Sequence, residues 1–313
     1  MMRATLNALT DELRRLKTAG VKTVPVTAEA MAALHAMVAQ QRATTAPAGT
    51  VPPALPPLPA AEPSPRIERK SAAAPQASPE TRSPTADPGP KPPSFTLPAG
   101  DKATRWAWLR DQVACDEVCC GQVRDGRKVV LGVGSLDASI FFCGEAPGAE
   151  EELQGEPFVG PAGQLLTKMI QAMGLERSDV YIGNIMNWRP QLPTSPSAAQ
   201  IGNRPPTAQE MAYCLPFLQA QIEIVAPQVI VALGATAAKG LLGADSFKAL
   251  GDVRGRWHTF AGRPLMVTYH PSYILRNQSN RSKRMIWEDL LKVMERVGLP
   301  ISARQQAFFL DRS

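Results

Sequence analysis

The chain has 313 residues, a formal net charge of +6 and 30 prolines, of which 16 fall between Pro47 and Pro98. That stretch has almost no aromatic or long apolar side chains, so burial cannot offset the entropy lost on ordering it, and the globular part must lie elsewhere. The sequence has no uninterrupted apolar run of about 18 residues and no basic segment followed by an apolar block at its start, which excludes a membrane span and a secretory signal from our expectations.

The first 100 residues predict two short elements and a linker. Leucines recur at helical spacing over residues 3–19, and methionines, leucine and valine repeat the pattern over 27–41. We therefore expect residues 1–44 to form an amphipathic helical segment, either a small hairpin that covers its own apolar faces or a docking element for a protein partner. Residues 45–100, rich in proline and alanine, are expected to be a disordered linker.

Short apolar runs alternate with helical patterns over residues 101–313, which predicts one α/β domain with a mostly parallel sheet. The expected strands are Ser139–Cys143, Val180–Ile185, Val229–Leu233 and Pro264–Tyr269. The expected helices are Pro161–Met173, Thr207–Ile224, Ala235–Leu242 and Ser282–Val297.

Polar side chains follow three of the four predicted strands. Glu145 follows the first strand, Asn184 ends the second and His270 follows the fourth, while Gly234 follows the third. Ligands of parallel sheets bind beyond the carboxyl ends of the strands, so a carboxylate, an amide and an imidazole are expected to meet in one pocket. Each feature also has a purely structural alternative. The loop at Glu145 is then a tight turn, Asn184 a cap of the next segment, and His270 a buried core histidine.

The distribution of charge and the cysteine content indicate the type of ligand and the cellular compartment. Residues 251–313 carry 11 basic and 5 acidic side chains, whereas residues 101–250 carry 12 and 16. A basic face suits a polyanion such as nucleic acid, although scattered solvated arginines are the alternative. Five cysteines without an export signal favour a reducing compartment, so we expect a cytoplasmic protein associated with the nucleoid.

Several segments of the chain resemble the family 4 uracil-DNA glycosylases. The resemblance spans roughly residues 115–297 and is carried by GEAPGAEEELQGEPFVGPAGQLL (144–166), VYIGNI (180–185), Asn203-Arg204-Pro205, VIVALGATAAKGLLG (229–243) and TYHPSYILR (268–276). It implies a three-layer α/β/α domain with a central, mostly parallel four-stranded sheet. The implied activity is base-excision repair: a monomer flips deoxyuridine out of DNA and hydrolyses its N-glycosidic bond, leaving an abasic site.

The resemblance also implies roles for individual residues. It assigns uracil binding to Ala146, Phe158 and Asn184, and catalysis to Glu145, Glu151 and His270. Phe158 would stack on the base, the Asn184 amide would pair with uracil but not cytosine, and His270 would donate to the departing oxyanion. One of the two glutamates would orient water and stabilise the cationic sugar, and the sequence leaves open which.

DNA contacts are expected from a loop rim and from the basic stretch that follows it. An apolar or planar wedge fills the space left by a flipped base, and lysines and arginines hold phosphates. The residues assigned in this way are Asn203, Tyr273, Leu275, Arg276, Arg281, Lys283 and Arg284.

The chain departs from the family in its cysteines and in one loop. The resemblance implies four cysteines that hold a [4Fe-4S] cluster, for which Cys115, Cys120 and Cys214 are the candidates, whereas Trp188 stands in the third position. We therefore expect no normal cluster and no cofactor requirement for the chemistry. Residues 192–200 look inserted in a loop that faces DNA.

Two other functions compete with the enzyme. A catalytically impaired protein could bind uracil-containing DNA or a repair partner on the same fold, and the missing cysteine favours this view. A hydrolase of free nucleosides or nucleotides is the second alternative, and the basic C-terminal stretch argues against it. Binding without an abasic product would identify the first, and turnover of free deoxyuridine the second.

Overall fold

A computed structural model describes residues 90–192 and 200–310 of the chain. The predictions for residues 1–44, for most of the linker and for the centre of the inserted loop lie outside these described residues. No helix of the described ranges is long and apolar enough to cross a membrane.

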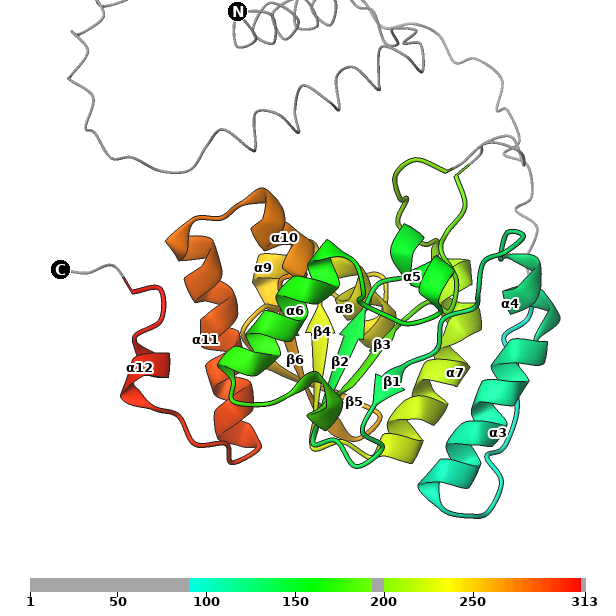
Figure 1. The fold of residues 1–313 in the computed structure, drawn as a ribbon, viewed down its shortest axis with the longest axis horizontal. Coiled ribbons are helices and arrows are strands. Elements are labelled where there is room, and N and C mark those ends of the chain that lie inside the picture. Colours follow the sequence, from blue (N-terminus) through cyan, green and yellow to red (C-terminus); the bar gives the residue numbers. More distant parts are fainter. Residues whose placement is uncertain (1–89, 193–199, 311–313) are drawn as a thin grey trace, which may run out of the picture. The chain divides into compact units, whose positions relative to one another are not determined.

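A six-stranded sheet in the order β1-β3-β2-β4-β6-β5 forms the centre of the domain (Figure 1). The strands are β1 (Val133–Gly134), β2 (Ile140–Gly144), β3 (Tyr181–Asn184), β4 (Val229–Leu233), β5 (Trp257–Phe260) and β6 (Arg263–Thr268). The four central strands are parallel, and each edge strand is antiparallel to its neighbour.

The four predicted strands are confirmed, with ends that differ by at most one residue from the expected ones. The expected four-stranded sheet is corrected to a mixed sheet of six strands. β1 has only two residues and β5 alternates exposed and half-buried positions, so neither gives the continuous apolar run that marked the central strands. β2, β3 and β4 are buried at every residue because helices cover both faces of the sheet.

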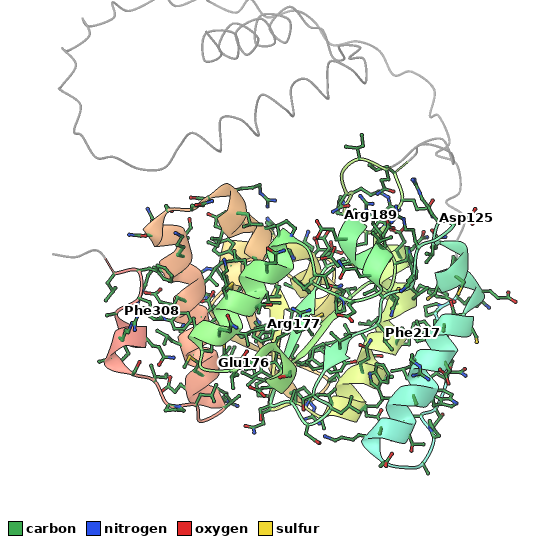
Figure 2. All side chains as sticks on the ribbon, in the orientation of Figure 1. Asp125, Glu176, Arg177, Arg189, Phe217 and Phe308 are labelled. Atoms are coloured by element: carbon green, nitrogen blue, oxygen red, sulfur yellow. The ribbon has the colours of Figure 1, made fainter. Side chains whose placement is uncertain are left out.

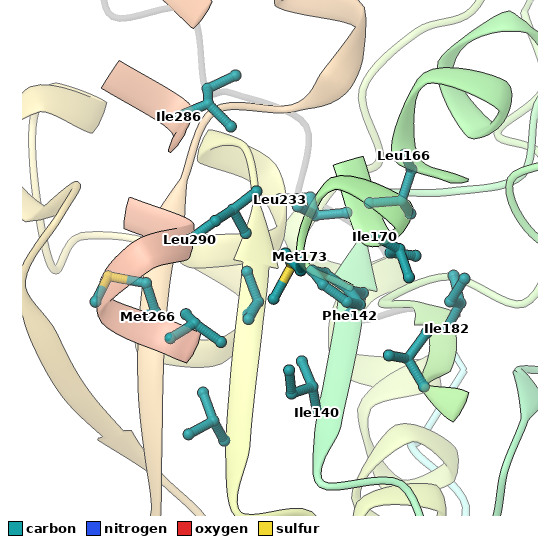
Figure 3. Close-up of a cluster of buried hydrophobic side chains, with 14 of the residues drawn as sticks. Ile140, Phe142, Leu166, Ile170, Met173, Ile182, Leu233, Met266, Ile286 and Leu290 are labelled. Atoms are coloured by element: carbon teal, nitrogen blue, oxygen red, sulfur yellow. The ribbon is translucent and has the colours of Figure 1, made fainter. Parts of the chain in front are cut away.

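One face of the sheet packs against α6 (Pro161–Ala172), α10 (Pro271–Arg276) and α11 (Asn280–Arg296) (Figure 1). Alternate strand residues such as Ile140 and Phe142 point to this side (Figure 3). They meet Leu166 and Ile170 of α6 and Leu290 of α11, and these side chains form one apolar cluster. Pro161 at the first position of α6 suits a helix start, where no intrahelical N–H bond is lost.

The opposite face packs against α7 (Ala208–Val225), α8 (Ala235–Leu242) and α9 (Leu250–Val253). Phe141 and Cys143, the neighbours of Phe142, point to this side because successive strand residues alternate in direction. Together the two faces give the expected three layers, and the α/β class is confirmed. The predicted helices correspond to α6, α7, α8 and α11.

A third apolar cluster lies on the outer side of α7. α3 (Lys102–Cys115) and α4 (Glu117–Gly121) pack there against Phe217 and Ile224 of α7. Phe95, which precedes α3, stacks on Phe217 with ring centroids 5.5 Å apart. The remaining helices are α5 (Ala149–Gln154), the 3-10 turn η1 (Arg177–Asp179) and α12 (Ala303–Gln306).

Candidate active site

A cavity of about 600 Å³ opens at the carboxyl ends of the parallel strands. The strand register aligns these ends, because Gly144 of β2 pairs with Asn184 of β3 and Leu233 of β4 pairs with Thr268 of β6. Nine of the residues selected from the sequence line the cavity: Glu145, Ala146, Glu151, Phe158, Asn184, Asn203, His270, Tyr273 and Arg276. The carboxylate, amide and imidazole therefore open onto one space.

Phe158 and Asn184 are buried side chains in the lining of this cavity. A side chain at Gly144 would place its Cβ 2.4 Å from both Asn184 Oδ1 and the Phe158 ring, so glycine is required there. Asn184 is only 8 % exposed, and within the described residues its Oδ1 has no hydrogen-bond partner. A buried acceptor without a donor is costly, and a ligand that donates a proton at this point would remove the cost.

His270 presents one defined ring nitrogen to the cavity. It is the N-cap of α10, and its Nδ1 accepts a hydrogen bond from the backbone N–H of Ser272 at 3.2 Å. Because Nδ1 is an acceptor there, the neutral ring carries its proton on Nε2. Burial, with a smaller contribution from Arg276, lowers the pKa of His270 to about 4, so the ring is neutral near pH 7. Its centroid lies 5.6 Å from that of Phe158.

Glu145 is a half-buried carboxylate directly after β2. Burial raises its pKa, and a hydrogen bond with the side chain of Thr236 acts in the opposite direction. Thr236 lies in the first turn of α8 and also lines the cavity. The sequence analysis missed this residue, although its position just after a strand end could have drawn attention to it.

Glu151 lines the same cavity, but its carboxylate is bound by the backbone. Oε2 accepts from Gly148 N at 3.1 Å, and Oε1 accepts from Val159 N at 3.1 Å and Gly160 N at 3.0 Å. Glu151 thereby ties the loop after β2 to the loop that carries Phe158. The two glutamates therefore differ: the partners of Glu151 are backbone amides, whereas Glu145 is held by a hydroxyl.

The residues predicted to contact DNA divide into two groups. Tyr273 and Arg276 line the cavity, and Leu275 of the same helix is 41 % exposed beside them. Arg281, Lys283 and Arg284 do not line the cavity. Arg284 binds Glu288 and the carbonyls of Gln306 and Phe308, and Lys283 lies 6.0 Å from the Phe309 ring, so both face the C-terminal segment.

Arg189 is a buried cation that the sequence analysis did not select. Its guanidinium pairs with Glu152 at 2.9 Å and donates to Asn203 Oδ1 at 2.8 Å and to the carbonyl of Gly202 at 2.8 Å. The Asn203 side chain is thus held by its oxygen, which leaves its amide hydrogens available at the cavity wall. These partners meet only in the folded chain, so the spacing of residues along the sequence did not indicate these contacts of Arg189.

The cysteines do not fit a four-thiolate cluster. Cys119 and Cys214 are buried and share a hydrogen bond, which together with burial raises the pKa of Cys119, whereas Cys115 and Cys120 are exposed. Trp188, 2 % exposed, packs in the same apolar cluster as the buried pair. Within the described ranges no group of three or more His, Cys, Asp or Glu side chains is placed to hold a metal ion.

The chain is similar to a known protein family and to several of its members. The model of the Uracil DNA glycosylase superfamily matches residues 131–291. The chain is 46% identical over 167 residues to a type-4 uracil-DNA glycosylase of Thermotoga maritima, an alignment that covers 52% of this chain and 80% of the relative. It is 38% identical over 177 residues to the type-4 enzyme of Pyrobaculum aerophilum, with 54% and 83% covered. The type-4 enzyme of Archaeoglobus fulgidus is 38% identical over 173 residues, with 53% and 81% covered.

Proposed function

Because the chain belongs to the uracil-DNA glycosylase superfamily and to its type-4 branch, we propose that it removes uracil from DNA in base-excision repair. The observation that carries this proposal is the buried, unpartnered Oδ1 of Asn184 beside the ring of Phe158. A nucleobase reaches such a site only when it is extruded from the stack, at a cost of a few kcal/mol.

Uracil recognition rests on Asn184 and Phe158. The N3–H of uracil donates to Asn184 Oδ1, and the Asn184 amide donates to uracil O4, while Phe158 stacks on the ring. Cytosine lacks the N3 hydrogen and carries an amino donor in place of O4, so it would leave both ends of the amide mismatched. Buried mismatches of this kind discriminate strongly between ligands.

Bond cleavage rests on His270 and Glu145. As the bond between C1′ and N1 breaks, uracil leaves as an anion and the sugar becomes cationic. The neutral His270 ring donates from Nε2 to uracil O2, where negative charge accumulates. The Glu145 carboxylate stabilises the sugar cation, orients the water whose oxygen bonds to C1′ and accepts the proton that this water releases. Glu151 shapes the site through its three amide contacts.

A labelled single-stranded oligonucleotide with one deoxyuridine tests the proposal. The protein should create an alkali-labile abasic site at that position and none in a thymine control. Asn184→Ala and His270→Ala should each lower the rate by about a hundredfold, as loss of a fixed donor in an active site often does.

His258→Ala provides the matched control. His258 lies on the edge strand β5, bonds to the carbonyl of Val253 and is not a cavity residue, so its loss should leave the rate unchanged. Absence of cleavage above the thymine control would refute the proposed activity. Turnover of free deoxyuridine without DNA would instead indicate a nucleoside hydrolase.

A further inference from the structure

Phe158 has an unfavourable backbone conformation. Its φ angle is 55°, in the left-handed region, where the Cβ of a residue other than glycine lies too close to the backbone. Of the non-glycine residues with a positive φ in the described ranges, only Phe158 lines the cavity. Such a conformation persists only where surrounding contacts enforce it. The contacts on either side of Phe158 therefore decide where its ring lies.

Two groups fix the backbone that follows Phe158. Oε1 of Glu151 accepts hydrogen bonds from the N–H groups of Val159 and Gly160 at 3.1 and 3.0 Å. Gly163 of α6 approaches so closely that a Cβ there would lie 1.8 Å from the carbonyl oxygen of Phe158. The loop after the ring is thus held by Glu151 and by the backbone of α6.

Arg177 binds the peptide group that precedes Phe158. Its Nη2 donates to the carbonyl of Pro157 at 2.6 Å, and its Nη1 donates to Thr167 Oγ1 of α6 at 3.4 Å. Figure 2 shows Arg177 beside α6. The guanidinium is planar and rigid, so two nitrogens with separate partners fix the Pro157 carbonyl relative to α6.

Acidic side chains of the same loop lie near Arg177. Burial lowers the pKa of Arg177, and the negative charges of Glu156 and Glu151 raise it. Glu156 lies two residues before Phe158, and Glu151 binds the amides after it. Arg177 itself does not line the cavity, so its contacts reach the site only through this loop.

We propose that Arg177 is a positioning residue that holds the Phe158 ring where the extruded base stacks. This inference rests on the proposed function for the identity of that base. The ring has little room to move, because a Cβ at Gly144 would lie 2.4 Å from it and the His270 ring centroid lies 5.6 Å from its own. A base stacked on a displaced ring would be misaligned with His270, and small misplacements of reacting groups slow a reaction strongly.

A double-mutant cycle with Phe158 tests the inference. Single-turnover uracil release at saturating protein is measured for the wild type, Arg177→Met, Phe158→Leu and the double variant. We expect Arg177→Met to lower the rate about tenfold when Phe158 is present and less than about twofold in the Phe158→Leu background. A residue that acts through the ring has no further effect once the ring is removed. Equal losses in the two backgrounds would overturn the inference.

Arg263→Met is the matched control. Arg263 is half-buried like Arg177, its Nη1 donates to the carbonyl of Pro227 at 2.7 Å, and it does not line the cavity. This variant should release uracil at the wild-type rate, and a loss in Arg177→Met no larger than in Arg263→Met would contradict the proposal. If Arg177→Met fails to fold, Arg177→Lys enters the same cycle, because its single nitrogen cannot reproduce both contacts of the guanidinium.

Fluorine NMR reports the position of the ring independently of activity. The chain has 9 phenylalanines. In protein labelled with para-fluorophenylalanine, the resonance that disappears in Phe158→Leu belongs to Phe158. Arg177→Met should shift or broaden this resonance, whereas Arg263→Met should leave it unchanged. An unchanged Phe158 resonance in Arg177→Met would overturn the inference.

The two measurements separate the role of Arg177 from the proposed activity. A wild type that releases no uracil refutes the activity, and the fluorine resonance then decides whether Arg177 positions Phe158. The resonance also decides if Phe158→Leu releases uracil too slowly to measure. A wild type that releases uracil while Arg177→Met keeps the full rate refutes the role of Arg177 and leaves the activity standing.

Discussion

Thr236 affects the pKa of Glu145, one of the two glutamates that line the cavity. Burial raises the pKa of Glu145, and the hydrogen bond with the Thr236 side chain offsets part of this rise by favouring the ionised form. In the proposed reaction Glu145 must be ionised to stabilise a sugar cation, so we expect this balance to set the lower pH limit of that reaction. His270 does not limit the reaction in that range, because its pKa lies at about 4.

Thr236→Val is expected to move the acidic limb of the kcat/KM profile to higher pH. Loss of the hydrogen bond, which favours the ionised form, raises the pKa of Glu145 further. The pH profile of uracil release measures the shift, and Thr236→Ser, which keeps the hydroxyl, should restore the wild-type profile. An acidic limb at the same pH in the valine variant would show that Thr236 does not act through Glu145.

At the scale of secondary-structure elements, α11 is hydrogen-bonded to the end of β6, and His270 follows that strand end. Asp289 of α11 is 1 % exposed and accepts hydrogen bonds from Thr268 Oγ1 at 2.6 Å and from Arg254 Nη1 at 2.8 Å. Arg254 also lies 5.4 Å from the ring of Tyr269, the residue before His270. One buried carboxylate therefore joins a helix, a strand end and the segment after α9.

Asp289→Ala should lower the free energy of unfolding by about 3 kcal/mol, because it removes the buried carboxylate that pairs with the half-buried Arg254 guanidinium and accepts from Thr268 Oγ1. Chemical denaturation monitored by tryptophan fluorescence measures the change. Glu288→Ala removes the adjacent, half-exposed carboxylate of the same helix and should cost less than about 1 kcal/mol. Equal losses in the two variants would contradict the role assigned to Asp289.

For the molecule as a whole, Trp188 is part of the apolar core at the position where the family resemblance implies a cluster cysteine. Its indole packs with Cys119 and Cys214 between α4, α7 and the chain after β3. The hydrogen bond between the two thiols and their burial raise the pKa of Cys119, so without a metal this thiol is protonated.

Protein purified without oxygen should therefore contain far less than one iron–sulfur cluster per chain. Visible absorbance and iron analysis measure this directly, and Cys119→Ser/Cys214→Ser should leave both unchanged. A brown protein whose long-wavelength absorbance disappears in the double variant would contradict the expectation. Uracil release should be the same for protein prepared with and without added iron and sulfide.

The sequence by itself determined the four central strands, the helices between them and the residues at their carboxyl ends. Those features are local: a fully apolar run marks a strand covered on both faces, and the residue after it must emerge at the edge of the sheet. Glu145, Asn184 and His270 could be selected together for that reason, before any contact between them was known.

Only the tertiary structure decided which partners each side chain meets. Glu151 and Glu145 are both acids beside the cavity, yet amides from two loops bind Glu151. Cys119 is buried with Cys214 and Cys120 is exposed, because successive helical residues point about 100° apart. Arg189 gains its role from a helix and a loop that are distant in sequence. Hydrogen bonding and burial depend on segments that meet only on folding, so no spacing along the chain encodes them.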